Sequence, residues 1–70
     1  MKEFLQNTVL TLRKKNKMTQ EELAKTLGVS RQTIVAIEKG HYMPSLILGI
    51  KIARLFKTGV EKIFIYKYEK

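Results

Sequence analysis

Few side chains in this sequence are of the kinds that perform covalent chemistry. The 70 residues include one histidine, His41, and neither cysteine nor aspartate. Nucleophilic catalysis needs an activated nucleophile beside a base, and a metal site needs several ligands. Ser30 and Ser45 stand where helices are expected to begin, which makes them capping residues. We therefore expect no enzyme activity, no bound metal and no cofactor.

The abundant functional groups are positively charged. Fourteen Lys and Arg residues face six acidic residues, all of them Glu, which gives a formal net charge of +8 at pH 7. A field of this sign attracts polyanions and accelerates their capture. Nucleic acid is the first candidate partner and an anionic membrane surface is the second, although many small basic domains only carry solvated lysines.

Length and hydropathy limit the architecture. Seventy residues make one domain with a modest core, whereas catalytic clefts usually need larger scaffolds. The lack of Cys excludes a disulfide framework. The longest apolar stretch, 46–50, ends at Lys51 and is far shorter than the roughly 20 residues that span a bilayer. Because the N-terminal residues also lack a signal-peptide pattern, we expect a soluble, cytoplasmic protein.

The first helix is predicted to begin near Asn7, which is a favourable N-cap residue. Leu5, Val9 and Leu12 have the i, i+4, i+7 spacing of one buried stripe. A basic run at 13–17 follows, where cations interact favourably with the helix dipole.

The next two helices are predicted to be joined by a tight turn. Thr19 and Glu22 have the spacing of a capping box, and Gly28 should end that helix in the left-handed conformation. Ser30 caps the following helix, which is predicted to run over residues 31–39 and to end at Gly40.

This window has the composition of a helix-turn-helix unit. Gly28 supplies the positive φ of the turn, and Val29 fills the angle between the helices. Ala24 is small enough for a close helix crossing, while Ile34 and Ile37 anchor the second helix from below. The opposite face of that helix is then free to enter a groove of nucleic acid. A plain helical hairpin is the alternative.

The rest of the chain is predicted to form two helices and a strand. Pro44 and Ser45 open a fourth helix that is apolar nearly all round, so we expect it to be central. A short fifth helix follows at 60–63, and the β-branched and aromatic tail 63–68 is typical of a strand. A lone strand is unstable, so the tail should pair either with residues 2–6 or with the same tail of a second subunit.

Residues 18–40, MTQEELAKTLGVSRQTIVAIEKG, resemble the Cro/C1-type repressors, also called the xenobiotic-response-element family. The segments 43–46 and 52–56 also match, and the resemblance covers about residues 7–64. It implies a mainly α, five-helix, lambda-repressor-like DNA-binding domain over residues 1–70. A short antiparallel β pair formed by the N- and C-terminal segments would be added to it. The minimal single-domain members are dimers with an added β-hairpin, which would explain the tail.

The resemblance also implies which residues contact DNA. Gln20 would bond a phosphate with its amide and the helix N-terminus, and Arg31 and Gln32 would face base edges. Val35 and Ala36 could offer only apolar contact, for example with a thymine methyl group. The loop after the recognition helix, residues 31–39, would approach the sugar–phosphate backbone. The full expected DNA-binding set is Gln20, Ser30, Arg31, Gln32, Thr33, Ala36, Lys39, His41 and Tyr42.

Arg13 and Glu38 match an ion pair of the family that ties the first helix to the end of the recognition helix. Each is flanked by a core position, Leu12 and Ile37 respectively. We therefore expect the pair to be at least half buried.

Three residues depart from the family pattern near the fourth and fifth helices. Gly49 stands inside the fourth helix where Ala is usual, which should cost up to about 1 kcal/mol. Lys57 stands where a helix-ending Gly is frequent, and Gly59 replaces a Ser or Thr cap. These departures affect the boundary between the two helices and leave the DNA-binding unit intact.

The combined interpretation is a sequence-specific transcription regulator, expected to be a repressor that binds double-stranded DNA at a near-palindromic operator as a homodimer. The alternative is the antitoxin of a toxin–antitoxin pair, which would hold a toxin with apolar surface around Ile47 or the tail. A membrane-active basic helix fits poorly, because Gly28, Gly40 and Pro44 interrupt the apolar faces. We therefore expect no membrane partner.

Overall fold

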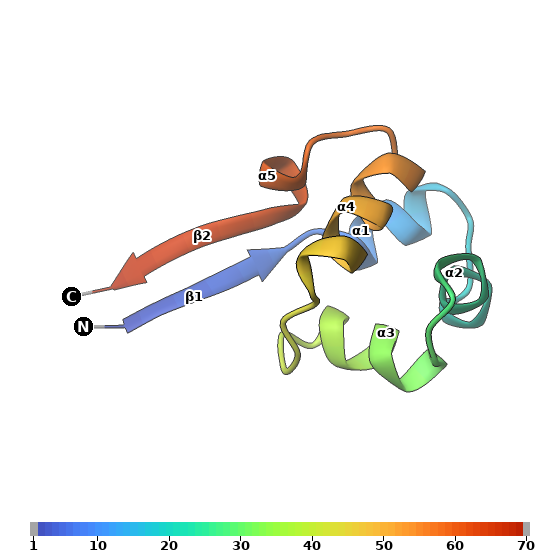
Figure 1. Cartoon of the computed structure of the whole chain (residues 1–70), viewed down its shortest axis with the longest axis horizontal. Helices are drawn as coiled ribbons and strands as arrows, with labels where there is room; N and C mark the ends of the chain where they lie inside the picture. The colour runs from blue at the N-terminus through green and yellow to red at the C-terminus, as the bar shows by residue number, and fades with distance from the viewer. Residues whose placement is uncertain (1, 70) are drawn as a thin grey trace.

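Five short helices form a body from which a two-stranded arm projects in the computed structural model, which describes residues 2–69 (Figure 1). The elements are β1 (Lys2–Asn7), α1 (Val9–Lys15), α2 (Gln20–Leu27), α3 (Arg31–Glu38), α4 (Leu46–Leu55), α5 (Val60–Ile63) and β2 (Phe64–Glu69). The predicted class, five helices with a terminal β pair, is confirmed.

The first helix begins at Val9, close to its predicted start near Asn7, but its cap is a different residue. Asn7 ends β1 instead of capping α1, and the N-cap is Thr8, whose side chain makes no capping bond. Residues 2–7 form a strand and not a helix, because their backbone pairs with β2. Leu5 therefore lies on the strand, and its assignment to a helical stripe is wrong. The Asn7 side chain still ties the junction together, since its Oδ1 accepts from the Val9 amide at 3.2 Å and its Nδ2 donates to the Ile37 carbonyl at 2.9 Å.

The two central helices begin and end where local chemistry predicts. Thr19 Oγ1 accepts from the Glu22 amide at 3.0 Å, and Glu22 Oε1 accepts from the Thr19 amide at 2.8 Å, which completes the capping box. Gly28 ends α2 with a φ of 76°, Ser30 caps α3, and Gly40 follows α3 with a φ of 77°. The turn between α2 and α3 is thus set by residues within the turn itself.

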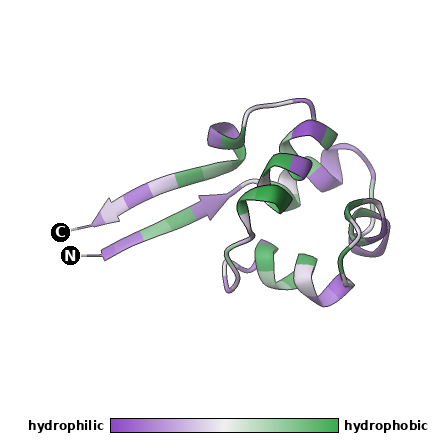
Figure 2. Ribbon diagram, viewed as in Figure 1, coloured by the Kyte–Doolittle hydropathy of each residue, from purple (hydrophilic) through white to green (hydrophobic). Residues whose placement is uncertain are grey.

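The core lies where the helices meet. Its buried residues are Val9, Leu23, Ala24, Leu27, Ile34, Ile37, Leu48, Ile52, Ala53 and Ile63. Ile34 and Ile37 are completely buried, which confirms that they anchor α3 from below. Figure 2 shows that hydrophobic residues also continue into α4 and both strands of the arm.

The fourth helix is only half buried, which corrects the prediction that it is central. Leu48 and Ile52 pack into the core, whereas Leu46 and Ile47 are each 74% exposed and Ile50 is 40% exposed. One side of α4 packs against α2 and α5. No other element of the described chain covers the opposite side, so its apolar residues face solvent.

The strands β1 and β2 pair antiparallel along their whole length, with Lys2 opposite Glu69 and Asn7 opposite Phe64. The tail therefore pairs with the N-terminal segment of its own chain, which decides between the two partners predicted for it. Each strand stabilises the other mainly through backbone hydrogen bonds, because the strand residues remain largely exposed.

One face of the arm carries aromatic residues that the body does not cover. Leu5 lies opposite Tyr66 and Glu3 lies opposite Tyr68, and residues opposite one another share a face. The Tyr66 hydroxyl donates to Glu3 Oε2 at 2.9 Å, although Tyr66 is 59% exposed. Phe64, at the base of the arm, instead packs against the core.

The departures from the family pattern are visible at the end of α4. Lys57 adopts a left-handed φ of 55°, the conformation that a glycine would take without strain. Gly59 is the N-cap of α5 and makes no side-chain capping bond. The bounds of α5 nevertheless agree with the prediction, because Val60 and Ile63 pack against or within the core.

Gly49→Ala is expected to stabilise the protein by about 0.5–1 kcal/mol, because glycine in a helix interior has more freedom to lose on folding than alanine. A Cβ at this position would lie 3.8 Å from Phe64 Cε2, an ordinary van der Waals contact. Urea denaturation gives the measurement. Gly40→Ala is the matched control and should be destabilising, since its φ is 77° even though its surroundings are open. Equal effects of the two substitutions would contradict the explanation.

Candidate nucleic-acid interface

The first turn of α3 offers hydrogen-bonding groups on the side away from its buried anchors. Arg31 and Gln32 are exposed, and Thr33, Val35 and Ala36 are partly buried. The outward face is therefore polar in the first turn and apolar in the second. A guanidinium and an amide side by side can read hydrogen-bonding groups on base edges, whereas the second turn can make only apolar contacts.

The two hydroxyl groups at the start of α3 are bonded to each other. Ser30 Oγ accepts from the Thr33 amide at 3.2 Å, and it lies 3.0 Å from Thr33 Oγ1. Both side chains therefore hold the N-terminus of α3 in place.

The loop after α3 places three further predicted residues together at the helix C-terminus. Lys39, His41 and Tyr42 are all exposed. The loop is held against the helix because the His41 amide donates to the Ala36 carbonyl at 2.9 Å and the Gly40 amide donates to the Ile37 carbonyl at 3.0 Å. Cationic and aromatic groups thus follow directly on the exposed face of α3.

A buried ion pair connects α1 to the last residue of α3. Arg13 Nε lies 2.6 Å from Glu38 Oε2, and the Arg13 and Glu38 side chains are only 10% and 5% exposed. Arg13 Nη2 also donates to Glu38 Oε1 at 3.2 Å, and Nη1 donates to the Met18 carbonyl at 2.9 Å. The prediction of an at least half-buried pair is confirmed.

Both partners of this pair are held in their charged forms. Burial alone would raise the pKa of Glu38, but hydrogen bonds from Arg13 and Gln20, with the charges of Arg13 and Lys14, outweigh burial and lower that pKa. The hydrogen bond to Glu38 raises the pKa of Arg13 by more than burial lowers it. The end of α3 is therefore fixed to α1 by a charge-assisted contact.

Gln20 and Arg31, predicted as separate contacts with DNA, are bonded to each other. Gln20 Nε2 donates to Glu38 Oε1 at 3.0 Å, and Arg31 Nη2 donates to Gln20 Oε1 at 3.2 Å. The two residues are 11 positions apart on different helices. No local pattern in the sequence indicates this bond, because it depends on how α2 and α3 cross.

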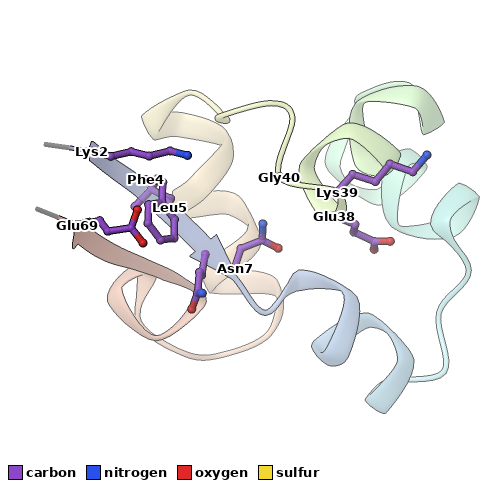
Figure 3. Close-up of a pocket in the computed structure, with 9 residues that line it drawn as sticks. Lys2, Phe4, Leu5, Asn7, Glu38, Lys39, Gly40 and Glu69 are labelled. Carbon is purple, nitrogen blue, oxygen red and sulfur yellow. The ribbon is translucent and has the colours of Figure 1, made fainter.

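A groove of about 610 Å³ separates β1 from the end of α3 (Figure 3). Lys2 and Glu69 line it from the arm, and Glu38, Lys39 and Gly40 line it from the body. Figure 3 shows the Lys39 side chain extending away from the arm. Because the groove carries both signs of charge, it does not form a simple anion site. Sequence reasoning did not identify it, since its two walls come from segments far apart in the described chain.

No group of three His, Cys, Asp or Glu residues within residues 2–69 is placed to hold a metal ion. No helix in the same range is long and apolar enough to cross a membrane.

Comparison with known proteins gives a consistent family. The helix-turn-helix family model matches residues 9–63. An uncharacterized HTH-type transcriptional regulator from Methanocaldococcus jannaschii is 56% identical over 63 residues, which are 90% of this chain and 96% of the relative. Another from Bacillus subtilis is 47% identical over 60 residues, with 86% and 91% of the two chains covered.

A solved structure has the same fold. It is a crystal structure of a candidate DNA-binding protein from Bacteroides fragilis, with a TM-score of 0.77 and 23% sequence identity. The match covers 87% of this chain and 98% of that protein. The arrangement of helices is thus shared at low sequence identity.

Proposed function

Because the chain belongs to the Cro/C1-type helix-turn-helix transcriptional regulators, we propose that it acts in the cytoplasm as a repressor that binds a near-palindromic operator as a homodimer. The observation that carries this proposal is the geometry of α3. Two completely buried isoleucines fix the helix to the core, and the opposite face exposes Arg31 and Gln32 on a chain with a net charge of +8. Such a helix can enter the major groove of DNA.

We assign separate tasks to the residues around α3. Arg31, the first residue of the helix, would donate two parallel bonds to guanine O6 and N7, and Gln32 would contact the neighbouring base. Gln20, at the N-terminus of α2, would contact a phosphate, and Lys39 and His41 would approach the backbone. Ser30, Thr33, Ala36 and Tyr42 complete the proposed contact surface.

Arg31→Ala should cost roughly 1–3 kcal/mol of affinity on the operator and remove the preference at one base pair of each half-site. Lys39→Ala should weaken binding to all sequences alike and reduce the dependence of log K on log salt by about one for each phosphate that the side chain neutralises. Binding to single-base operator variants at several salt concentrations gives both quantities. An equal loss for every variant after Arg31→Ala would make Arg31 a phosphate contact and leave readout to Gln32 and Thr33.

The homodimer would form through an apolar shoulder, which we define as Met43, Leu46, Ile47, Ile50 and Tyr66. These residues are 68%, 74%, 74%, 40% and 59% exposed in turn. Exposed apolar surface of this kind marks an interaction site. The five shoulder residues are uncharged, so burying them against a second copy removes no charge of the shoulder from water.

The position of the shoulder agrees with a second copy as its occupant. Met43 and Leu46 border a shallow groove of about 260 Å³, which Leu5 and Phe64 also line. Met43, Leu46 and Ile47 follow the loop after α3, so a dimer formed there would carry two α3 helices in one fixed arrangement. One eight-residue helix spans about 12 Å and reads few base pairs. Two copies about 34 Å apart would read successive turns of one DNA face.

Repression would follow from occupancy. A dimer bound across two major-groove half-sites would obstruct the promoter that contains them. A DNase footprint upstream of the gene, combined with transcription in the presence and absence of the protein, tests this assignment. Increased transcription on binding would make the protein an activator.

A further inference from the structure

The hydrogen bonds behind α3 assign an indirect role in recognition to Glu38. We propose that Glu38 is a positioning residue that acts through Gln20 to hold the Arg31 guanidinium where it meets DNA. This inference rests on the proposed role of Arg31 in base readout. It adds that the specificity of Arg31 depends on a carboxylate that is itself buried away from DNA.

The orientation of the Gln20 amide carries the argument. An ionised carboxylate can only accept hydrogen bonds, and a guanidinium can only donate them. Gln20 lies between a carboxylate and a guanidinium. Its Nε2 is 3.0 Å from Oε1 of Glu38, and its own Oε1 is 3.2 Å from Nη2 of Arg31. Only one of the two orientations of the amide satisfies both neighbours. The carboxylate of Glu38 and the guanidinium of Arg31 therefore favour the same orientation, with the Gln20 oxygen toward Arg31.

The inner end of this chain of bonds is rigid. Glu38 is held by two nitrogens of Arg13 at 2.6 and 3.2 Å, and its side chain is 5% exposed. Arg13 is fixed in turn by the Met18 carbonyl at 2.9 Å. Gln20 is partly buried, and Arg31 is exposed. The chain of bonds thus runs from a fixed charge in the core to a long side chain at the surface.

A fixed Arg31 side chain is better suited to recognise a base than a mobile one. A guanidinium recognises guanine through two parallel bonds, which require a defined plane and direction. Arg31 uses one N–H for Gln20 and keeps the others for a base. Holding the side chain in place before binding reduces the conformational entropy that binding costs. Breaking the bond to Gln20 should therefore reduce discrimination at the base pair that Arg31 reads.

Glu38→Gln is the first test variant. If Arg13 Nε retains the amide oxygen of the new residue at the position of Oε2, the NH2 group takes the position of Oε1, where it faces both Arg13 Nη2 and Gln20. The Gln20 amide must then turn its oxygen inward and its NH2 toward Arg31, which repels the guanidinium. The readout is the ratio of affinities for the operator, selected from a randomised duplex pool, and for its variant at the base pair read by Arg31. We expect this ratio to fall by about fivefold or more.

The matched control is Glu22→Gln. It removes the same charge from the first turn of α2, where Gln20 also lies, and it preserves the capping box, which Gln can complete as well. The Glu22 carboxylate bonds the Thr19 amide and stands outside the chain of bonds from Arg13 to Arg31. Its replacement should therefore leave the ratio unchanged.

Gln20→Met is a second test variant, which replaces Glu38→Gln if that variant does not fold. It breaks the chain of bonds and leaves the pair of Arg13 and Glu38 intact. Removal of a phosphate contact would lower affinity for all sequences, but only removal of the bond to Arg31 lowers the ratio. In the free protein, NMR should show that the Arg31 Nη protons exchange more slowly in the wild type than in either variant.

The outcomes separate the two levels of the proposal. A wild-type protein that prefers no sequence overturns both the proposed function and this inference. A wild-type protein that discriminates, with variants that retain the same ratio and the same Arg31 exchange, overturns the inference alone. A reduced ratio in Glu38→Gln and Gln20→Met, with a wild-type ratio in Glu22→Gln, supports it.

Discussion

Glu38→Ala should reduce the free energy of unfolding by about 3–5 kcal/mol, because it leaves the Arg13 guanidinium buried without its partner. The two side chains are 10% and 5% exposed, so the loss is not screened as it would be at the surface. An exposed pair would contribute at most about 1 kcal/mol. Small domains have a total stability of only about 5–15 kcal/mol, and the variant should therefore be largely unfolded at moderate urea concentrations.

The double variant Arg13→Met with Glu38→Leu separates the effect of the stranded charge from that of reduced packing. Replacing both members of a buried pair by apolar residues is often neutral or stabilising. We therefore expect the double variant to recover most of the stability that Glu38→Ala loses. The measurement is the urea midpoint with its slope. A midpoint for Glu38→Ala equal to that of the wild type would contradict the burial of the pair.

The free energy of unfolding at acid pH provides a second test of the same ion pair. The pKa of Glu38 is lowered in the folded protein. Its contribution to stability is therefore complete above its unfolded pKa of about 4.3 and is lost as the pH falls through the lower folded value. In Glu38→Ala this contribution is absent at every pH, so the free energy of unfolding should fall less steeply in acid than it does in the wild type.

Ile47→Glu should convert the proposed homodimer to a monomer and lower operator affinity by about 100-fold or more, because binding of two linked recognition helices exceeds the affinity of either alone. Ile47 is 74% exposed, so the substitution should not disturb the core. At the proposed contact the new carboxylates would have to lose water on association, which opposes dimer formation. Analytical ultracentrifugation at micromolar concentration measures the assembly, and titration of operator DNA measures the affinity.

Leu10→Glu is the control for the change in charge. Leu10 is also an exposed apolar residue, at 40%, and lies on α1 outside the apolar shoulder. The variant carries the same additional negative charge but should remain dimeric. A wild-type protein that sediments as a monomer and binds a single half-site would refute the dimer. The shoulder would then be available to another protein, as the antitoxin interpretation requires.

The helix boundaries that sequence reasoning predicted well depend on local chemistry. Thr19 and Glu22 satisfy each other's backbone groups within one turn, and Gly28 adopts a φ that favours glycine. Ser30 caps α3 in the same way. All partners in these contacts lie within a few residues, so the spacing of residue types was enough to place α2 and α3.

The segment before the first helix was wrongly assigned to the helix, because the strand that pairs with this segment is distant in sequence. Asn7 has the side chain of an N-cap, but its backbone belongs to a strand that pairs with Phe64. The β-branched and aromatic composition of the tail predicted a strand, and the sequence left two partners for it. Only the folded chain shows that its own N-terminal segment takes that place.

The sequence by itself determined the helix-turn-helix unit, the anchoring of α3 by Ile34 and Ile37, and the net charge of +8 that favours a polyanionic partner. Periodicity and capping are local properties and can be read from a single chain. The exposed side of α4 and the bond from Arg31 to Gln20 were decided only by the tertiary structure. An apolar helix does not show in its sequence which side will be covered, and two polar residues on different helices meet only when those helices cross.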